Sequence, residues 1–292
     1  MAAANNMRNI VSNEILVKEN NVQWDDVIGN AAAKDALRKT IVLPVEQGRH
    51  FPVESVLLFG APGTGKTLLV RALASQCSAF FFQLSTSMLT SKYSGYKIHL
   101  LKTLFDMAKE QPSIVFLDDI EMISTCEHDN DVVISQIQLE IIRQMHQIAR
   151  DSAAHVAIIA ATNRPREVDS DILELFTARI HIQFLNIEER MELFKKLLEQ
   201  HGCNVLTENE VKEIANLTTD YTGSDLALVV RIASIEPIRD LLNTGNWEEN
   251  TSRLRSIQTR DFYAALNETK PSVPPDEIKS FYTFSEHCCG DG

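Results

Sequence analysis

The chain has 292 residues, which is more than one ordinary domain and fewer than three. Apolar residues make up 44% and charged residues 23% of the sequence, proportions that exclude a disordered chain, a collagen and a disulfide scaffold. The 28 basic and 40 acidic residues leave a formal net charge of −12, which argues against a nucleic-acid partner and against a surface for anionic membranes.

Other global features restrict the compartment. No apolar run approaches the roughly 18 residues needed to span a bilayer, so we expect no transmembrane segment. The first residues lack the basic-then-apolar layout of a secretory signal. The five cysteines contain no CxxC pair, and their odd number suits reduced thiols in the cytosol or nucleus.

Short β-branched and aromatic runs alternate with helical stretches in the first part of the chain. This order is typical of βαβ units with a mainly parallel sheet. Helical periodicity of apolar residues predicts a helix over 132–150, and a similar face is formed by Ile98, Leu101 and Phe105. The expected strands are 55–59, 79–84, 114–117, 156–160 and 180–184.

Beyond about residue 185 the strand signal stops, and a helical domain is predicted. Thr222 or Ser224 would cap its longest helix. A polar stretch at 243–256 resembles a loop, and prolines near residue 274 precede a short final helix. The expected helices are 187–201, 208–217, 224–242, 259–266 and 276–284.

One segment fits the phosphate-binding pattern GxxxxGK[ST], and it lies between an apolar strand and an apolar helix. Glycines let backbone N–H groups surround phosphates, Lys66 meets the β/γ charge, and the Thr67 hydroxyl can ligate Mg²⁺. A chance glycine turn before Lys-Thr would arise in about one chain of this length in a hundred. We therefore predict a nucleotide-binding turn formed by Gly60, Ala61, Pro62, Gly63, Thr64, Gly65, Lys66, Thr67 and Leu68.

A second apolar strand ends in two carboxylates. In phosphoryl-transfer sites the first acid, here Asp118, holds Mg²⁺ and the next, here Asp119, orients the attacking water. The alternative is that the two acids only cap the following turn. Asn163 ends the next strand, where it can reach the γ-phosphate or its water. We predict Lys66, Asp119 and Asn163 as catalytic residues, with Thr67 and Asp118 on the metal.

With these elements in this order, the chain resembles the AAA-type ATPases, in the clade of katanin, spastin, fidgetin and the vacuolar-sorting ATPase that disassembles ESCRT-III. Residues 24–29 resemble the family's entry segment, so Ile28 and Gly29 would contact adenine. Residues 221–225 are similar to the lid motif, which implies base contacts by Gly223 and Ser224. Residues 236–239 and 269–272 match the clade's C-terminal signatures.

The resemblance implies an α/β P-loop NTPase fold, with a three-layer parallel sheet and a C-terminal helical lid domain. The cofactors would be ATP and Mg²⁺, and the partners would be copies of this chain or related AAA subunits in a ring, a hexamer by analogy. The implied domains are an N-terminal extension at 1–22, the nucleotide-binding α/β domain at 23–185, the lid domain at 186–268, and a C-terminal helix and tail at 269–292.

Within the clade, residues 11–16 and 116–121 look most like the branch of the second A-like katanin catalytic subunit. That branch implies a protein polymer, microtubules, as substrate and a cytoplasmic, cytoskeleton-associated location. The tail around 284–286 is similar to the ESCRT-III-disassembling ATPase, but the β-hairpin insertion of that branch has no room in 243–256.

Two features depart from the family pattern at the hydrolysis site. Asp119 stands where the family has Glu, and one methylene fewer withdraws the carboxylate by roughly an ångström. Glu174 and Leu175 stand where the family has two adjacent arginines that reach a neighbour's γ-phosphate. An arginine of this kind, called an arginine finger, accelerates phosphoryl transfer by a factor of about 10³–10⁵. Weakened hydrolysis is therefore expected in a ring of identical chains.

These departures leave two readings open. The chain is either an active remodelling ATPase or a hydrolysis-deficient, ATP-binding regulatory subunit of a mixed ring. A nucleotide kinase using the same turn is disfavoured by the C-terminal helical domain.

A pore is also implied by the resemblance, with Lys92 and Tyr93 in a loop that grips a threaded peptide. No Lys or Arg lies between Asp118 and Gln138, where six residues are acidic. In katanin-like relatives the second pore loop in this region is basic and attracts the acidic tails of tubulin. An acidic channel would repel those tails, which argues against microtubules as substrate.

Overall fold

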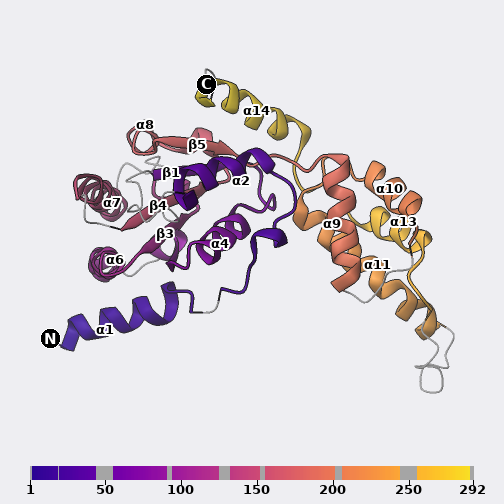
Figure 1. Cartoon of the computed structure of the whole chain (residues 1–292), viewed down its shortest axis with the longest axis horizontal. Helices are drawn as coiled ribbons and strands as arrows, with labels where there is room; N and C mark the ends of the chain where they lie inside the picture. Colours follow the sequence, from indigo (N-terminus) through magenta and orange to yellow (C-terminus); the bar gives the residue numbers. More distant parts are fainter. Residues whose placement is uncertain are drawn as a thin grey trace. The chain divides into compact units, whose positions relative to one another are not determined.

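The computed structural model describes residues 2–18, 20–43, 55–90, 94–124, 132–151, 155–200, 206–243 and 255–289. The contacts divide the chain into two compact units (Figure 1). The first unit comprises Met1–Gly60, Lys66–Ile182 and Ser280–Gly292, and the second comprises Ala61–Gly65 and Gln183–Lys279.

The first unit is built on a five-stranded sheet with the order β2-β3-β4-β1-β5, and every pairing in it is parallel. Both faces of a parallel sheet are covered, which is why β1 and β4 are buried along their whole length and read as continuous apolar runs. The strands are β1 (Ser55–Phe59), β2 (Phe80–Ser85), β3 (Ser113–Asp118), β4 (Val156–Thr162) and β5 (Ala178–His181).

Helices cover the two faces of this sheet (Figure 1). One buried cluster joins α6 and α7 to one face, and a second cluster joins α2 and α4 to the other. The helices of this unit are α1 (Ala2–Ile10), α2 (Ala31–Leu37), α4 (Lys66–Gln76), α5 (Ser87–Thr90), α6 (Ser94–Ala108), α7 (Val132–Arg150) and α8 (Ser170–Leu173). Short helical turns are η1 (Val11–Ile15), η2 (Trp24–Asp26), η3 (Arg38–Val42), η4 (Ile120–Ile123) and η5 (Pro165–Glu167).

The N-terminal segment covers the free edge of β2. Val11 and Ile15 are buried in the cluster that contains α6. Leu16 forms an antiparallel bridge with Phe82, and the Val17 N–H donates to the Phe81 carbonyl at 2.9 Å. An exposed sheet edge would pair with other chains, so this segment protects the sheet against aggregation.

The second unit is helical, with α9 (Ile187–Gln200), α10 (Glu208–Leu217), α11 (Gly223–Asn243) and α13 (Thr259–Glu268). A single buried cluster holds these helices together, and the rings of Phe194 and Phe262 meet edge to face at 6.2 Å in it. The last helix, α14 (Pro275–Cys289), begins in this unit and ends in the first. No helix in the described ranges is long and apolar enough to cross a membrane.

The predicted bounds of β1, α7 and α10 are confirmed, and those of β2, β3, β4, α9, α11 and α13 differ by one or two residues at one or both ends. The last strand and the last helix differ more. The last strand was expected at 180–184 but forms at Ala178–His181, because it pairs with β1 and β1 ends at Phe59, opposite His181. The last helix was expected at 276–284 and is longer at both ends. Pro275 occupies its first position, where a missing N–H loses no hydrogen bond.

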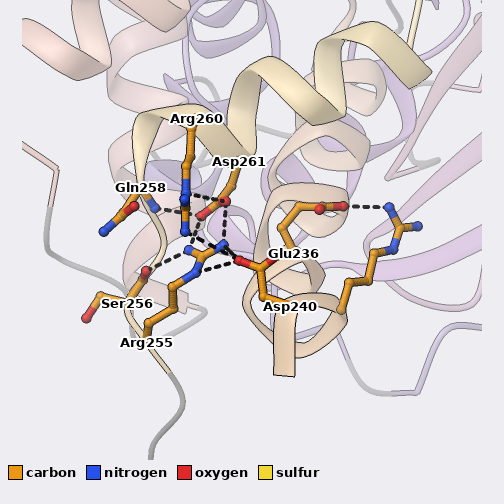
Figure 2. Close-up of polar contacts among 8 residues, drawn as sticks. Glu236, Asp240, Arg255, Ser256, Gln258, Arg260 and Asp261 are labelled. Carbon is orange, nitrogen blue, oxygen red and sulfur yellow. Dashed lines mark hydrogen bonds and ion pairs between the residues drawn. The ribbon is translucent and has the colours of Figure 1, made fainter. Parts of the chain in front are cut away.

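A cluster of ion pairs lies at the start of α13 in the second unit (Figure 2). The Arg255 guanidinium donates to Asp240 Oδ2 at 2.5 and 2.9 Å and to both carboxylate oxygens of Asp261 at 2.7 Å. The Asp261 side chain is only 3% exposed and also accepts from the Gln258 N–H at 2.8 Å. Burial raises the pKa of Asp261, but the bonds and charge of Arg255 outweigh it and hold that pKa below its ordinary value.

Arg255→Met should lower the free energy of unfolding at pH 7 by about 2 kcal/mol, because it leaves the buried Asp261 carboxylate without its strongest donor. A carboxylate whose pKa is lowered by folding stabilises the fold above its unfolded pKa, near 3.9, and this contribution is lost as pH falls through the folded pKa. The difference between the variant and the wild type should therefore shrink on acidification to about pH 3. Urea unfolding at both pH values measures it.

The matched control is Arg260→Met, since Arg260 is 63% exposed and lies 3.4 Å from Asp240 and 3.9 Å from Asp261. We expect a loss below about 0.5 kcal/mol for this control. Equal losses in the two variants would contradict the prediction, as would a loss in Arg255→Met that is undiminished in acid.

Candidate nucleotide-binding site

The carboxyl ends of β3, β4 and β1 lie side by side at one edge of the sheet, because these strands are adjacent and parallel. Ligands of open α/β sheets bind outside this edge. Gly60 follows β1, Asp118 ends β3 with Asp119 directly after it, and Asn163 follows β4. The structure therefore brings these predicted site residues to a common edge.

The turn between β1 and α4 needs glycine at two positions for steric reasons. Gly60 has φ +152°, and a Cβ atom added there would lie 2.4 Å from the Ile182 carbonyl oxygen. Gly63 has φ +79°, and its Cβ would lie 2.8 Å from Thr222 Oγ1 and 3.0 Å from Ser224 Oγ. A side chain at Gly60 would force the backbone apart, and one at Gly63 would displace the side chains of Thr222 and Ser224, so these glycines serve the shape of the turn.

Lys66, the first residue of α4, is 5% exposed, and its Nζ donates to the Gly60 carbonyl at 2.8 Å. Burial lowers the pKa of Lys66 to about 8, against the charges of Asp118, Glu121 and Asp119, which raise it. A desolvated ammonium at a helix N-terminus is an electrostatic site for an anion.

Thr67 and Asp118 form a pair of oxygen donors beside this lysine. The Thr67 hydroxyl donates to Asp118 Oδ2 at 3.0 Å. Burial and the neighbouring Asp119 raise the pKa of Asp118, whereas the bond from Thr67 lowers it. Hard oxygen donors suit Mg²⁺, which usually takes one or two protein ligands and completes its shell with water and phosphate. These residues therefore fit the expected metal.

Among the described residues, no group of three or more His, Cys, Asp or Glu side chains is arranged to hold a metal ion by itself. Thr67 and Asp118 would instead share an ion with a bound phosphate.

Asp119 and Asn163 are in direct contact. The Asn163 side-chain amide donates to Asp119 Oδ1 at 3.1 Å, which fixes the orientation of the carboxylate. The backbone of Asp119 is left-handed, with φ 56° and ψ 49°, and its carbonyl accepts a hydrogen bond from the Thr86 hydroxyl. Left-handed backbone outside glycine is uncommon and clusters at functional sites.

Glu121 is a site residue that the sequence reasoning missed. Its side chain is buried, and its Oε1 accepts from the Asn163 N–H at 3.3 Å, so it ties the end of β3 to the end of β4. Burial raises the pKa of Glu121. The available signal was an acid within the apolar run Ile120–Ile123, where a charged side chain needs a buried partner.

The residues expected near the base lie in two places. Ile28 and Gly29 are half-buried in the first unit, in a turn with φ 73° at Gly29 and φ 54° at Asn30. In the second unit, the Ser224 N–H donates to the Gly63 carbonyl at 3.2 Å, and a Cβ added to Gly223 would lie 3.3 Å from that oxygen. Their contacts with adenine stay predictions.

The proposed pore residues Lys92 and Tyr93 lie outside the described residues, as do 125–131 of the acidic stretch, so their roles stay predictions. Glu174 is exposed at the end of α8. The Leu175 carbonyl accepts from the Ser55 hydroxyl, and Leu175 lines a cavity of about 160 Å³.

Two nearby arginines are engaged within the chain. Arg179 donates to the Leu173 carbonyl at 2.8 Å, and Arg164 pairs with Glu167 at 3.3 Å. Neither arginine occupies the two positions at which the family carries its fingers.

Comparison with known proteins gives two family matches. The ATPase family associated with various cellular activities (AAA) matches residues 56–184, and the AAA+ lid domain matches residues 209–252. Spastin from Anopheles gambiae is 37% identical over 287 residues, which covers 93% of this chain and 34% of that protein. Spastin from Homo sapiens is 34% identical over 292 residues, which covers 96% of this chain and 47% of that protein. The chain thus spans less than half the length of these two relatives.

Solved structures give the same result. The FIGL-1 AAA domain in complex with ADP is 30% identical with a TM-score of 0.86, and the match covers 97% of this chain and 96% of that one. A katanin structure, from work on katanin self-assembly, is 24% identical with a TM-score of 0.77 and covers 98% of this chain and 97% of that one, which shows a shared fold. The expected P-loop NTPase fold is confirmed, and the katanin branch stays a prediction. The chain belongs to the AAA ATPase family, in the clade of katanin, spastin and fidgetin-type AAA domains.

Proposed function

We propose that this chain binds and hydrolyses ATP as an AAA remodelling subunit within a ring of AAA subunits. The observation that carries the proposal is the buried Lys66 ammonium beside the Thr67–Asp118 pair. Cation, hydroxyl and carboxylate are the groups that a triphosphate and its metal require, and here they converge on a helix N-terminus. ADP in the FIGL-1 structure supports a nucleotide as the ligand.

Each side chain would have a separate task. Lys66 and the backbone N–H groups of the turn would bind the phosphates, with Thr67 and Asp118 on Mg²⁺. The bound ion would neutralise developing charge on the phosphoryl oxygens. Asp119 would orient the attacking water, and Asn163, which already holds Asp119 Oδ1, would keep that carboxylate aligned.

The partners follow from the relatives. Katanin self-assembly is the subject of one similar structure, and we propose that this chain likewise assembles with copies of itself or with related AAA subunits, in a hexamer. A protein polymer would be remodelled in the cytoplasm, with microtubules as the first candidate by the katanin-like resemblance. The acids between Asp118 and Asp131 oppose an acidic polymer tail, so an ESCRT-III-type filament is the alternative substrate.

A second candidate function rests on Glu174, Leu175 and Asp119. We propose as the alternative that the chain binds ATP and regulates a mixed ring without much turnover of its own. Glu174 is exposed and negative where a ring of this family would present an arginine to the neighbour's γ-phosphate. Negative charge there would oppose the charge that develops in the transition state.

The double substitution Glu174→Arg and Leu175→Arg should raise the steady-state ATPase rate of a homo-oligomer by at least about tenfold, because it restores the finger charge. The rate is measured for the purified full chain, alone and mixed with an active katanin-type subunit. Glu199→Arg, an exposed acid on α9, is the charge-matched control and should leave the rate unchanged.

The outcomes separate the two functions. Robust turnover by the unmodified chain alone contradicts the regulatory function, and no turnover in either condition contradicts the enzyme. A flat response to the two new arginines contradicts the finger argument itself.

ATP affinity should depend on pH through Lys66. Since its pKa is about 8 without ligand and a bound phosphate favours the charged form, affinity should fall about tenfold between pH 7 and pH 9. The folding stability of the nucleotide-free chain should depend on pH in the opposite direction. Folding lowers this pKa, so the unfolded chain binds more protons between pH 8 and the ordinary lysine value, and stability should rise over that window.

Calorimetry with a non-hydrolysable ATP analogue and Mg²⁺ measures this dependence. Lys66→Met should lose affinity by about 100-fold at pH 7 and lose the dependence on pH, because the charge-assisted contacts with phosphate disappear. Lys195→Met, at an exposed ion pair on α9, is the control that should retain both. An unmodified chain that binds equally well at pH 7 and pH 9 would overturn the prediction.

A further inference from the structure

The segment that follows α13 is hydrogen-bonded to the residues that precede and begin α11, all within the second unit. The Tyr221 hydroxyl donates to the Thr269 carbonyl at 2.8 Å. The Ser272 hydroxyl donates to Asp225 Oδ2 at 2.9 Å, and the Ser272 N–H donates to the same oxygen at 3.2 Å. Residues 221–225 and residues 269–272, which resemble two separate family signatures, are therefore joined in one hydrogen-bonded cluster.

Asp225 links this hydrogen-bonded cluster to the start of α11. Its carboxylate is buried, and Oδ2 also accepts from the Thr222 N–H at 2.9 Å. In return the Asp225 N–H donates to Thr222 Oγ1 at 3.2 Å, which makes a reciprocal capping pair. One carboxylate oxygen thus accepts hydrogen bonds from two N–H groups and one hydroxyl, and bonds to a charged acceptor are the stronger kind.

The capping pair lies directly against the phosphate-binding turn. A Cβ on Gly63 would come within 2.8 Å of Thr222 Oγ1 and 3.0 Å of the Ser224 Cβ, so no side chain separates them. The Ser224 N–H donates to the Gly63 carbonyl at 3.2 Å. The conformation of Gly63 therefore depends on where Thr222 and Ser224 are held.

We propose that Ser272 and Asp225 are positioning residues for the phosphate-binding turn, acting through Thr222 and Ser224 on Gly63. This inference rests on the proposed function, since it assigns these residues to the nucleotide site. Neither residue needs to touch ATP. Ser272 fixes the Asp225 carboxylate, Asp225 fixes Thr222, and the turn keeps the shape in which its N–H groups point at phosphate.

A cap for α11 alone does not account for Ser272. The reciprocal bonds of Thr222 and Asp225 already satisfy the helix start, and Ser272 comes 47 residues later from an exposed position. The core beside it is formed by Tyr221, Thr269 and Val273, all buried. Removal of the Ser272 hydroxyl should therefore change the turn much more than the fold.

Ser272→Ala tests the proposal in the full chain. The Kd for ADP with Mg²⁺ and the KM for ATP should rise about fivefold, less than the full effect of a hydrogen bond to a charged group, because the Ser272 N–H still donates to Asp225. The kcat should stay within about twofold. Backbone amides of Ala61–Gly65 should exchange hydrogen faster without ligand, and the melting temperature should stay within about 2 °C. Ser272→Thr, which keeps the hydroxyl, should restore all values.

Two further variants sharpen the test. Ser272→Asp should weaken ADP binding more than Ser272→Ala, because a second carboxylate would face Asp225. Ser234→Ala is the matched control, since the Ser234 hydroxyl on α11 bonds only to the Arg231 carbonyl in the hydrogen bonds recorded for the described residues, and it should change nothing.

The possible failures are distinguishable. If the unmodified chain binds ADP normally while Ser272→Ala shows the same Kd and the same exchange at Ala61–Gly65, this proposal alone is overturned. If the unmodified chain binds no nucleotide, the proposed function is overturned and this inference with it. A fall in melting temperature without faster exchange at the turn would assign Ser272 a structural role and overturn the proposal.

Discussion

The buried charge of Lys66 is the constraint on which the rest of the site depends. An ammonium that is 5% exposed is unfavourable, and the chain offsets its desolvation with the Gly60 carbonyl and with the charges of Asp118, Asp119 and Glu121. These three carboxylates exceed one ammonium. An ATP polyanion entering such an edge would meet excess negative charge, so a divalent cation has to enter with it. The charge balance, like the oxygen donors, thus supports the Mg²⁺ that we propose as the partner of ATP at this site.

Local signals in the sequence predict much of this site. The motif from Gly60 to Thr67 is one continuous stretch of the chain, and so are the two acids at the end of β3. The strand order then brings the two motifs to one edge of the sheet. Features that arise from tertiary contacts were not predictable in the same way. The end of β5 is set by its pairing with β1, and Glu121 becomes a site residue only because the Asn163 N–H meets it. The bond between Asp225 and Ser272 joins residues 47 positions apart, which no pattern in one sequence specifies.

The shorter acid at residue 119 is best considered together with its neighbour Glu121 and their shared partner, Asn163. Asp119 has the shorter side chain, but its left-handed backbone and the bond from Thr86 decide where its carboxylate lies. Glu121 has the longer side chain and reaches across to the backbone of Asn163. Asn163 therefore holds both acids, one through its amide and one through its N–H. The loss of one methylene at residue 119 must be judged together with this shared partner, because the backbone conformation also determines where the carboxylate lies.

The departures from the family act at different places, and this difference separates binding from hydrolysis. Lys66, Thr67 and Asp118 belong to the site that the chain would use itself, and their contacts are complete without Glu174 or Leu175. In the family the finger acts on the site of a neighbour, so a chain that lacks it loses nothing from its own phosphate contacts. In a ring of identical chains every site would lack its finger. In a mixed ring of the kind we propose, this chain's site would receive a finger from an active neighbour, whereas the site that this chain faces would receive Glu174. The same sequence would then allow turnover at one interface and block it at the next, so the composition of the proposed ring, and not the chain alone, would determine the activity.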